Sequence, residues 1–131
     1  MAILTKEQTT IQKIFHVLVV EDNPADADLV HEMFSEDPTF QFKVSVASRL
    51  DEAIDLVSEI TPDAILLDLN LPDSQGLDTL TRLRTVLDDS VTVVVLTGVG
   101  DEKLGPTAIQ LKAQDYLVKG RLAEGTATWS G

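Results

Sequence analysis

The chain has 131 residues, no cysteine, and a formal net charge of −12 from 22 acidic and 10 basic side chains. Its length predicts one domain, since domains commonly contain about 100–150 residues. Without cysteine, a disulfide framework, a thiolate zinc site and a cysteine nucleophile are excluded. The negative charge argues against direct binding to nucleic acid or to an anionic membrane. No apolar run approaches the ~18 residues of a membrane span, and the first 13 residues lack the pattern of a signal peptide. We therefore expect a cytoplasmic domain.

Short runs rich in β-branched residues alternate with segments of helical periodicity. The expected strands cover residues 15–20, 40–47, 64–67, 91–96 and 116–118. Side chains typical of helix starts follow the first four strands: Asn23-Pro24, Ser48, Asp73 or Ser74, and Asp101-Glu102. Strands that alternate with helices form βαβ units with right-handed crossovers. The fold class is therefore α/β, a doubly wound, five-stranded parallel sheet.

Two segments lie outside this alternation. Residues 1–13 are an N-terminal extension with a short helical pattern, and residues 121–131 are a flexible or atypical C-terminal tail rich in small residues. The domain itself is expected to span residues 14–120. A fifth helix after the last strand is predicted to be short or absent, because the final twelve residues, 120–131, contain three glycines.

Polar side chains stand where four of the expected strands end. Each one alone is well explained as a cap, a solvated turn or a surface charge. In an open parallel sheet, however, sites form outside the carboxyl ends of the strands, so the joint pattern indicates a functional site. The residues concerned are Glu21-Asp22, Asp68, Thr97 followed by Gly98, and Lys119.

Charge decides what such a site can hold. Two like charges ~4 Å apart cost about 4 kcal/mol at an effective dielectric near 20, so three clustered carboxylates need a cation or a proton. Carboxylate oxygens suit Mg²⁺, which also retains water and binds phosphate. A neutralised Asp68 is a plausible nucleophile toward a phosphoryl group. Lys119, the Thr97 hydroxyl and the Gly98 N–H could neutralise and position the phosphoryl oxygens.

Four segments carry a family resemblance: VLVVEDN at 17–23, DAILLDLNLP at 63–72, VLTG at 95–98 and DYLVK at 115–119. Together they resemble the response-regulator receiver domain of bacterial two-component signalling. The resemblance covers residues 15–120 and implies a flavodoxin-like fold, similar to chemotaxis receivers, with strand order 2-1-3-4-5.

The resemblance implies a role for each residue of the acidic group. Asp68 would accept the phosphoryl group. Asp22 and Asp68 would bind Mg²⁺ through their carboxylates, and Asn70 would bind it through its backbone carbonyl. Glu21 would lie behind these ligands and support them.

The resemblance also implies a switch and a partner. Thr97 and Lys119 would bind phosphoryl oxygens, and Tyr116 would swing inward when Thr97 moves, which changes the surface of the fourth helix and fifth strand. Tyr116 is also readily explained as a half-buried strand aromatic. The phosphoryl donor would be a histidine kinase or a histidine phosphotransfer protein. The domain would not be an enzyme in its own right, beyond self-catalysed phosphotransfer and slow autodephosphorylation.

Three departures from the family pattern stand out. The fifth helix is expected to be short or absent, and Gly105-Pro106 interrupts the fourth, which could instead begin at Pro106. Gly120 stands where many family members have a cis proline. Without a fifth helix, one face of the sheet would lack a cover. We therefore expect self-association or partner docking on the side of the fourth helix and fifth strand.

Other functions remain open at this point. The main alternative is a receiver-like interaction module that works without phosphorylation. An aspartate-nucleophile phosphohydrolase would carry two aspartates at its first strand, where this chain has Glu21-Asp22. A flavin carrier would need a hydroxyl-rich phosphate loop there. His16 and His31 are not expected to have a chemical role.

Overall fold

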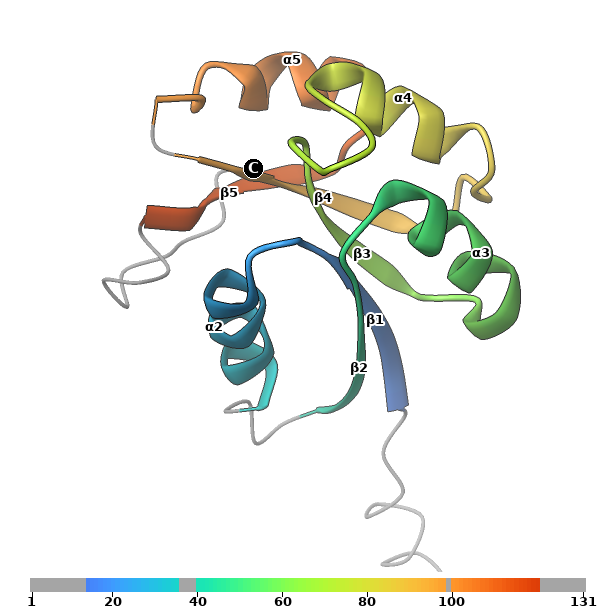
Figure 1. Ribbon diagram of the computed structural model, residues 1–131. Helices are drawn as coiled ribbons and strands as arrows, with labels where there is room; N and C mark the ends of the chain where they lie inside the picture. The colour runs from blue at the N-terminus through green and yellow to red at the C-terminus, as the bar shows by residue number, and fades with distance from the viewer. Residues whose placement is uncertain (1–13, 36–39, 99, 121–131) are drawn as a thin grey trace, which may run out of the picture.

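The computed structural model describes residues 14–35, 40–98 and 100–120. Five parallel strands form one sheet in the order β2-β1-β3-β4-β5, which confirms the predicted fold class and strand order (Figure 1). The strands are β1 (Ile14–Val20), β2 (Gln41–Ala47), β3 (Ala64–Asp68), β4 (Thr92–Thr97) and β5 (Asp115–Val118). The helices are α2 (Pro24–Ser35), α3 (Leu50–Ile60), α4 (Leu77–Arg84) and α5 (Leu104–Gln110).

Helices cover both faces of the sheet. The helix α2 lies on one face, and α3, α4 and α5 lie together on the other (Figure 1). Each face has its own apolar core: Leu18 and Ile65 point to the larger core, Val19 and Leu66 to the core beneath α2. This explains why β3 and the second half of β1 are apolar without alternation, since a strand buried on both faces needs no polar side.

The face that we expected to lack a cover does not expose its strand side chains. Val94, Leu96 and Leu117 belong to the core on the α2 side and are 6%, 1% and 1% exposed. The described strands therefore present no apolar patch there. The expected short or absent fifth helix, the extension at 1–13 and the tail at 121–131 fall outside the described residues, of which Lys119 and Gly120 are the last and are helical.

The predicted start of α2 is well supported by local geometry, whereas the start of α5 is shifted from the predicted positions. The Asn23 side-chain oxygen accepts hydrogen bonds from the N–H groups of Ala25 and Asp26, at 2.9 and 3.3 Å, and Pro24 occupies the first helical position. In α5, Pro106 falls in the first turn, where its missing N–H breaks no helical bond. The helix is consequently short and begins at Leu104, between the two starts that the sequence suggested.

The third helix start was predicted wrongly. Asp73 does not cap α4, which begins after Gly76 at a φ of 69°. Its carboxylate instead accepts the N–H groups of Leu50 and Asp51, at 2.8 and 2.9 Å, and so caps α3. Sequence spacing favoured the nearer helix, but the loop after β3 runs back across the start of α3.

Within the described residues, no helix combines the length and apolar character that a membrane crossing requires.

Candidate functional site

The register of the strands brings the predicted site residues to one edge of the sheet. Val20 lies opposite Leu67, so the chain passes through Glu21 beside Asp68. Asp68 lies opposite Leu96, and the next residue of β4 is Thr97. Parallel pairing aligns all carboxyl ends, and this is why residues almost a hundred positions apart meet here.

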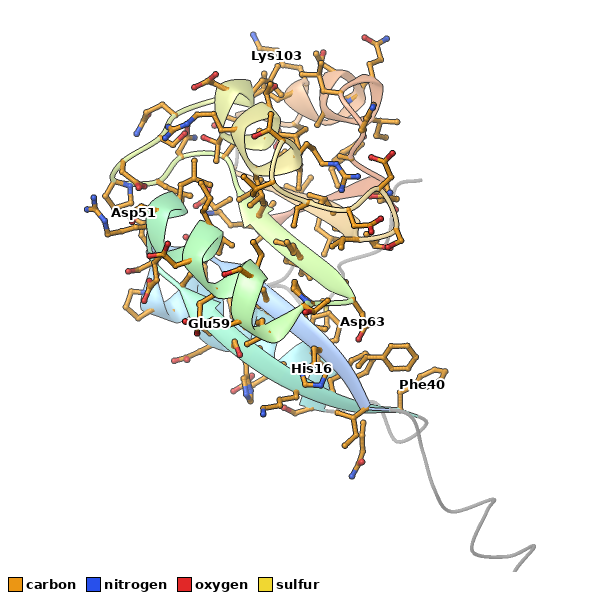
Figure 2. All side chains as sticks on the ribbon, turned by 90° about the vertical axis from the view of Figure 1, so that its right-hand side faces the viewer. His16, Phe40, Asp51, Glu59, Asp63 and Lys103 are labelled. Atoms are coloured by element: carbon orange, nitrogen blue, oxygen red, sulfur yellow. The ribbon has the colours of Figure 1, made fainter. Side chains whose placement is uncertain are left out.

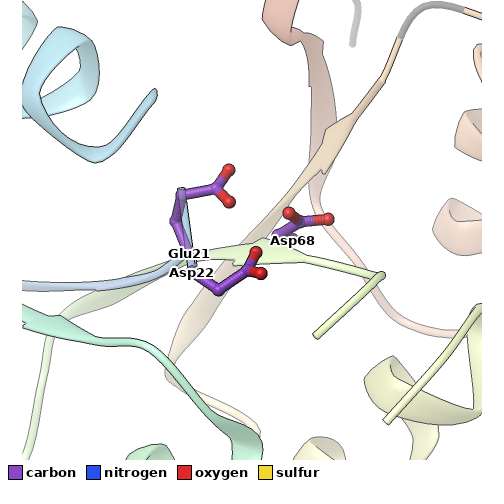
Figure 3. Close-up of side chains that lie close together, drawn as sticks. All are labelled: Glu21, Asp22 and Asp68. Carbon is purple, nitrogen blue, oxygen red and sulfur yellow. The ribbon is translucent and has the colours of Figure 1, made fainter. Parts of the chain in front are cut away.

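Three carboxylates form a cluster at this edge. One oxygen from each of Glu21, Asp22 and Asp68 lies within 4.8 Å of the others. Figure 3 shows the three side chains turned toward a common point, two from the end of β1 and one from the end of β3. Glu21 and Asp68 are buried, whereas Asp22 is exposed. The group, which we call the acidic cluster, is spaced to share one cation, and its oxygens are the donors that Mg²⁺ prefers.

Lys119 supplies positive charge to this cluster. Its Nζ lies 2.9 Å from Glu21 Oε1, 3.1 Å from Asp68 Oδ2 and 3.3 Å from Asp26 Oδ2. The lysine side chain is 17% exposed, while the side chains of Glu21 and Asp68 are 0% and 7% exposed. Such short contacts away from water are strong, because little solvent screens the charges.

The surroundings shift two pKa values in the site. Burial, followed by the neighbouring Asp68 carboxylate, raises the pKa of Glu21 to about 7, although hydrogen bonds from Lys119 and from the Asn23 N–H act to lower it. Burial alone would lower the pKa of Lys119, but Glu21 and Asp68 outweigh it and raise that pKa above its ordinary value. Lys119 therefore remains an ammonium group at neutral pH.

Asp68 is held by its own loop. Its Oδ1 accepts the N–H of Asn70 at 2.9 Å, while its Oδ2 accepts from Lys119. Further along, the buried Thr79 hydroxyl donates to the carbonyl of Leu69 at 2.8 Å and contacts the Ser74 hydroxyl at 2.8 Å. These bonds fix the backbone that leaves β3, so the carboxylate has a defined direction.

Glu21 and Asp22 offer their oxygens differently. Glu21 Oε2 accepts the N–H of Asn23 at 3.1 Å, and its Oε1 accepts from Lys119, so both oxygens have partners. Asp22 is exposed at the cluster's rim. This arrangement fits the expectation that Asp22 contacts a metal ion and Glu21 supports the site from behind, though the roles themselves stay predictions.

Of the predicted switch residues, Thr97 and Gly98 are at the same edge and Tyr116 lies further back along β5; their contacts are with other partners. The buried Thr97 hydroxyl donates to the carbonyl of Leu117 at 3.2 Å. Gly98 lies next to Asp101. The Tyr116 ring packs on α5, where a Cβ built on Gly105 would approach ring atoms to 2.5 Å. Among the described contacts, none joins Thr97 or Tyr116 to the acidic cluster, so their switching roles stay predictions.

Sequence reasoning missed Asp26, the third partner of Lys119. A signal was present: Asp26 is in the first turn of the helix that directly follows β1, and helix starts after parallel strands lie at the carboxyl edge. The two histidines lie elsewhere. His31 is exposed on α2 beside Ser35, and His16 donates its backbone N–H to Asp63.

Comparisons with known proteins agree with this geometry. Residues 17–125 match the model of the response regulator receiver domain. The methanogenesis regulatory protein FilR1 of Methanothrix harundinacea is 34% identical over 107 residues, which are 80% of this chain and 24% of that protein. Sporulation initiation phosphotransferase F of Bacillus subtilis is 29% identical over 79% of this chain and 80% of that one.

Solved structures lead to the same family. The Mn²⁺-bound form of response regulator Rcp1 matches with a TM-score of 0.70 and 29% identity, over 86% of each chain. This chain spans about a quarter of FilR1, and so corresponds to one part of that protein. A sheet of order 2-1-3-4-5, an acidic edge and a family model that matches most of the sequence coincide. The chain belongs to the response regulator receiver domains.

Proposed function

We propose that this domain accepts a phosphoryl group on Asp68 from a phosphohistidine of a histidine kinase or phosphotransfer protein, in the cytoplasm. The observation that carries the proposal is the buried Asp68 carboxylate, held between the Asn70 N–H and Lys119. It lies beside two further carboxylates at the carboxyl edge of the sheet. A nucleophile held in this way needs little reorganisation before it reacts.

The residues divide the task of phosphoryl transfer. An Asp68 oxygen attacks phosphorus and forms a P–O bond, while the P–N bond breaks and leaves its electron pair on the imidazole nitrogen. Lys119 is placed to donate to the phosphoryl oxygens as they approach. Thr97 would join it, once its hydroxyl leaves the carbonyl of Leu117.

The acidic cluster fits a magnesium ion. Asp22 and Asp68 would bind it through carboxylates and Asn70 through its backbone carbonyl, with Glu21 supporting them. When bound, Mg²⁺ would neutralise charge on the carboxylates and on the phosphoryl oxygens. The chain's own contribution is to hold its carboxylates close together despite their repulsion. We propose no catalytic turnover beyond phosphotransfer and slow hydrolysis of the phosphorylated form.

The test is incubation with acetyl phosphate and Mg²⁺, followed by intact-mass measurement. We expect the parent protein to gain one acid-labile phosphoryl group and Asp68→Asn to gain none, while its circular dichroism is unchanged. Asp22→Ala should weaken Mg²⁺ binding and slow the transfer. Undiminished phosphorylation of Asp68→Asn would refute the assignment. A parent protein without any adduct would favour the phosphorylation-independent interaction module.

A further inference from the structure

Lys119 has one partner that does not belong to the acidic cluster. Asp26 Oδ2 lies 3.3 Å from Nζ, yet Asp26 is not among the three carboxylates that are spaced to share a cation. It comes from the first turn of α2, whereas Lys119 follows β5. The contact therefore joins the helix after the first strand to the residue after the last one.

Lys119 is engaged by all three carboxylates: it donates hydrogen bonds to Glu21 and Asp68 and forms an ion pair with Asp26. An ammonium group has three N–H donors, and three carboxylates lie within 3.3 Å of Nζ. To donate to a phosphoryl oxygen, Nζ must turn against the attraction of these carboxylates. Asp26 has the longest of the three contacts and the most exposed side chain, at 26%, against 0% for Glu21. Water can solvate Asp26 when the lysine leaves, so this contact costs least to break.

We propose that Asp26 is a positioning residue that competes with the phosphoryl group for Lys119 and thereby slows phosphorylation of Asp68. The inference rests on the proposed function. Two effects act in the same direction: Asp26 attracts the ammonium group that the phosphoryl group needs, and its negative charge opposes the arrival of another anion. Asp26 thus sets how readily the domain accepts a phosphoryl group, and for how long it keeps it.

The local structure keeps Asp26 in this position. Its N–H is capped by Asn23 at 3.3 Å, which anchors the first turn of α2 next to the cluster. Asp28, two residues further along the same helix, is exposed, and the structure shows no ion pair for it among the described residues. Asp28→Asn therefore makes the same change of net charge without touching Lys119, and serves as the matched control.

The experiment compares Asp26→Asn, Asp28→Asn and Asp26→Glu in the full chain. Each is incubated with Mg²⁺ and a series of acetyl phosphate concentrations, and the phosphoryl adduct is followed by intact mass. We expect Asp26→Asn to be phosphorylated about two- to fivefold faster, the range for one partly exposed ion pair. Its adduct should also decay more slowly once acetyl phosphate is removed. Asp28→Asn should match the parent, and Asp26→Glu should return toward it because the negative charge is restored.

The outcomes separate this inference from the proposed function. Equal rates for Asp26→Asn and Asp28→Asn, or equal rates for Asp26→Asn and Asp26→Glu, would overturn the inference while Asp68 phosphorylation stands. Slower phosphorylation of Asp26→Asn, with an unchanged melting temperature, would overturn it too, since it would show that Asp26 assists the transfer. A parent protein that gains no phosphoryl group would overturn the proposed function and this inference with it.

Discussion

The two ends of the sheet carry side chains of different kinds, charged at one end and aromatic at the other. At the carboxyl end, Lys119 is surrounded by the carboxylates of Glu21, Asp26 and Asp68. At the amino end, the rings of all four phenylalanines of the protein form one connected group, with the centroids of contacting rings 4.8–6.3 Å apart. Figure 2 shows Phe40 at this end, near His16 and Asp63 and far from Asp51 at the start of α3.

The difference shows how one small fold supplies both stability and reactivity. Aromatic pairs stabilise beyond their buried area by about 0.5–1.5 kcal/mol each, so the amino end should stabilise the fold. Clustered carboxylates repel one another and resist burial, so the carboxyl end should destabilise the metal-free protein. Substitutions at the two ends should consequently have separable effects.

The largest effect is expected from Phe42→Ala. Phe42 contacts three other rings, those of Phe15, Phe34 and Phe40, so its loss should lower the free energy of unfolding by about 3 kcal/mol. The control is Phe40→Ala, since Phe40 is 47% exposed and should cost less. Denaturant unfolding measures both. The rate of phosphorylation by acetyl phosphate should not change, and a parallel loss of phosphorylation in folded protein would show that the two ends are not separable.

Magnesium should produce the next largest effect, at the opposite end. It binds the folded cluster and not the dispersed carboxylates of the unfolded chain, so it should stabilise by about 2.7 kcal/mol at a hundredfold excess over Kd. The melting temperature in MgCl₂ is compared with that in NaCl at matched ionic strength, because sodium provides screening alone. Equal stabilisation by both salts would exclude a specific cation site. Asp22→Ala should reduce the difference between the melting temperatures in MgCl₂ and in NaCl.

The sequence was sufficient for most of this fold because its signals are local and repeated. The apolar runs of β1 and β3 and the Asn23-Pro24 helix start are read directly from neighbouring residues. The convergence of Glu21, Asp68 and Lys119 then follows from parallel pairing alone.

What the sequence did not predict depends on side-chain contacts between distant segments. Asp73 caps α3 rather than α4 because the loop after β3 turns back. Asp26 reaches Lys119 because α2 starts at the same edge as β5 ends. In the sequence, Gly105 interrupts the pattern of α5; in the structure, it is the position at which the Tyr116 ring packs closely against the helix. No periodicity encodes such pairs, and only the positions of the elements in space reveal them.

A smaller effect is expected where β5 meets α5, between the two ends. A Cβ on Gly105 would lie 2.5 Å from the Tyr116 ring, near its Cγ, so the whole ring would have to move. Gly105→Ala should therefore destabilise by about 1–2 kcal/mol, despite the better helix propensity of alanine. Since Tyr116 is the only tyrosine, a fluorinated tyrosine reports its ring by NMR. In the Tyr116→Ala background, Gly105→Ala should become neutral or stabilising. An unchanged cost there would mean that the ring is not what resists the methyl group.

The smallest effect is expected at Asp73, on the loop that leaves the acidic cluster. Slight burial acts to raise the pKa of Asp73, but the N–H groups of Asp51 and Leu50 outweigh it and hold the pKa below the ordinary value of 3.8. The charged form is thus favoured by folding, and its contribution is present above pH 3.8 and lost as the pH falls through the lower folded value.

Asp73→Asn should consequently lower the free energy of unfolding by about 1 kcal/mol at neutral pH, because one of the two accepting oxygens becomes an NH₂ group that cannot accept an N–H. The difference in the free energy of unfolding between variant and parent should become smaller as the pH falls below 3.8, because the parent's own Asp73 carboxylate becomes protonated. Asp55→Asn, on the exposed side of α3, serves as the control and should stay within about 0.5 kcal/mol of the parent. Denaturant unfolding at a series of pH values measures all three proteins. A gap that stays constant into strong acid would show that Asp73 acts through its shape rather than its charge, and that the loop after Asp68 is not anchored electrostatically to α3.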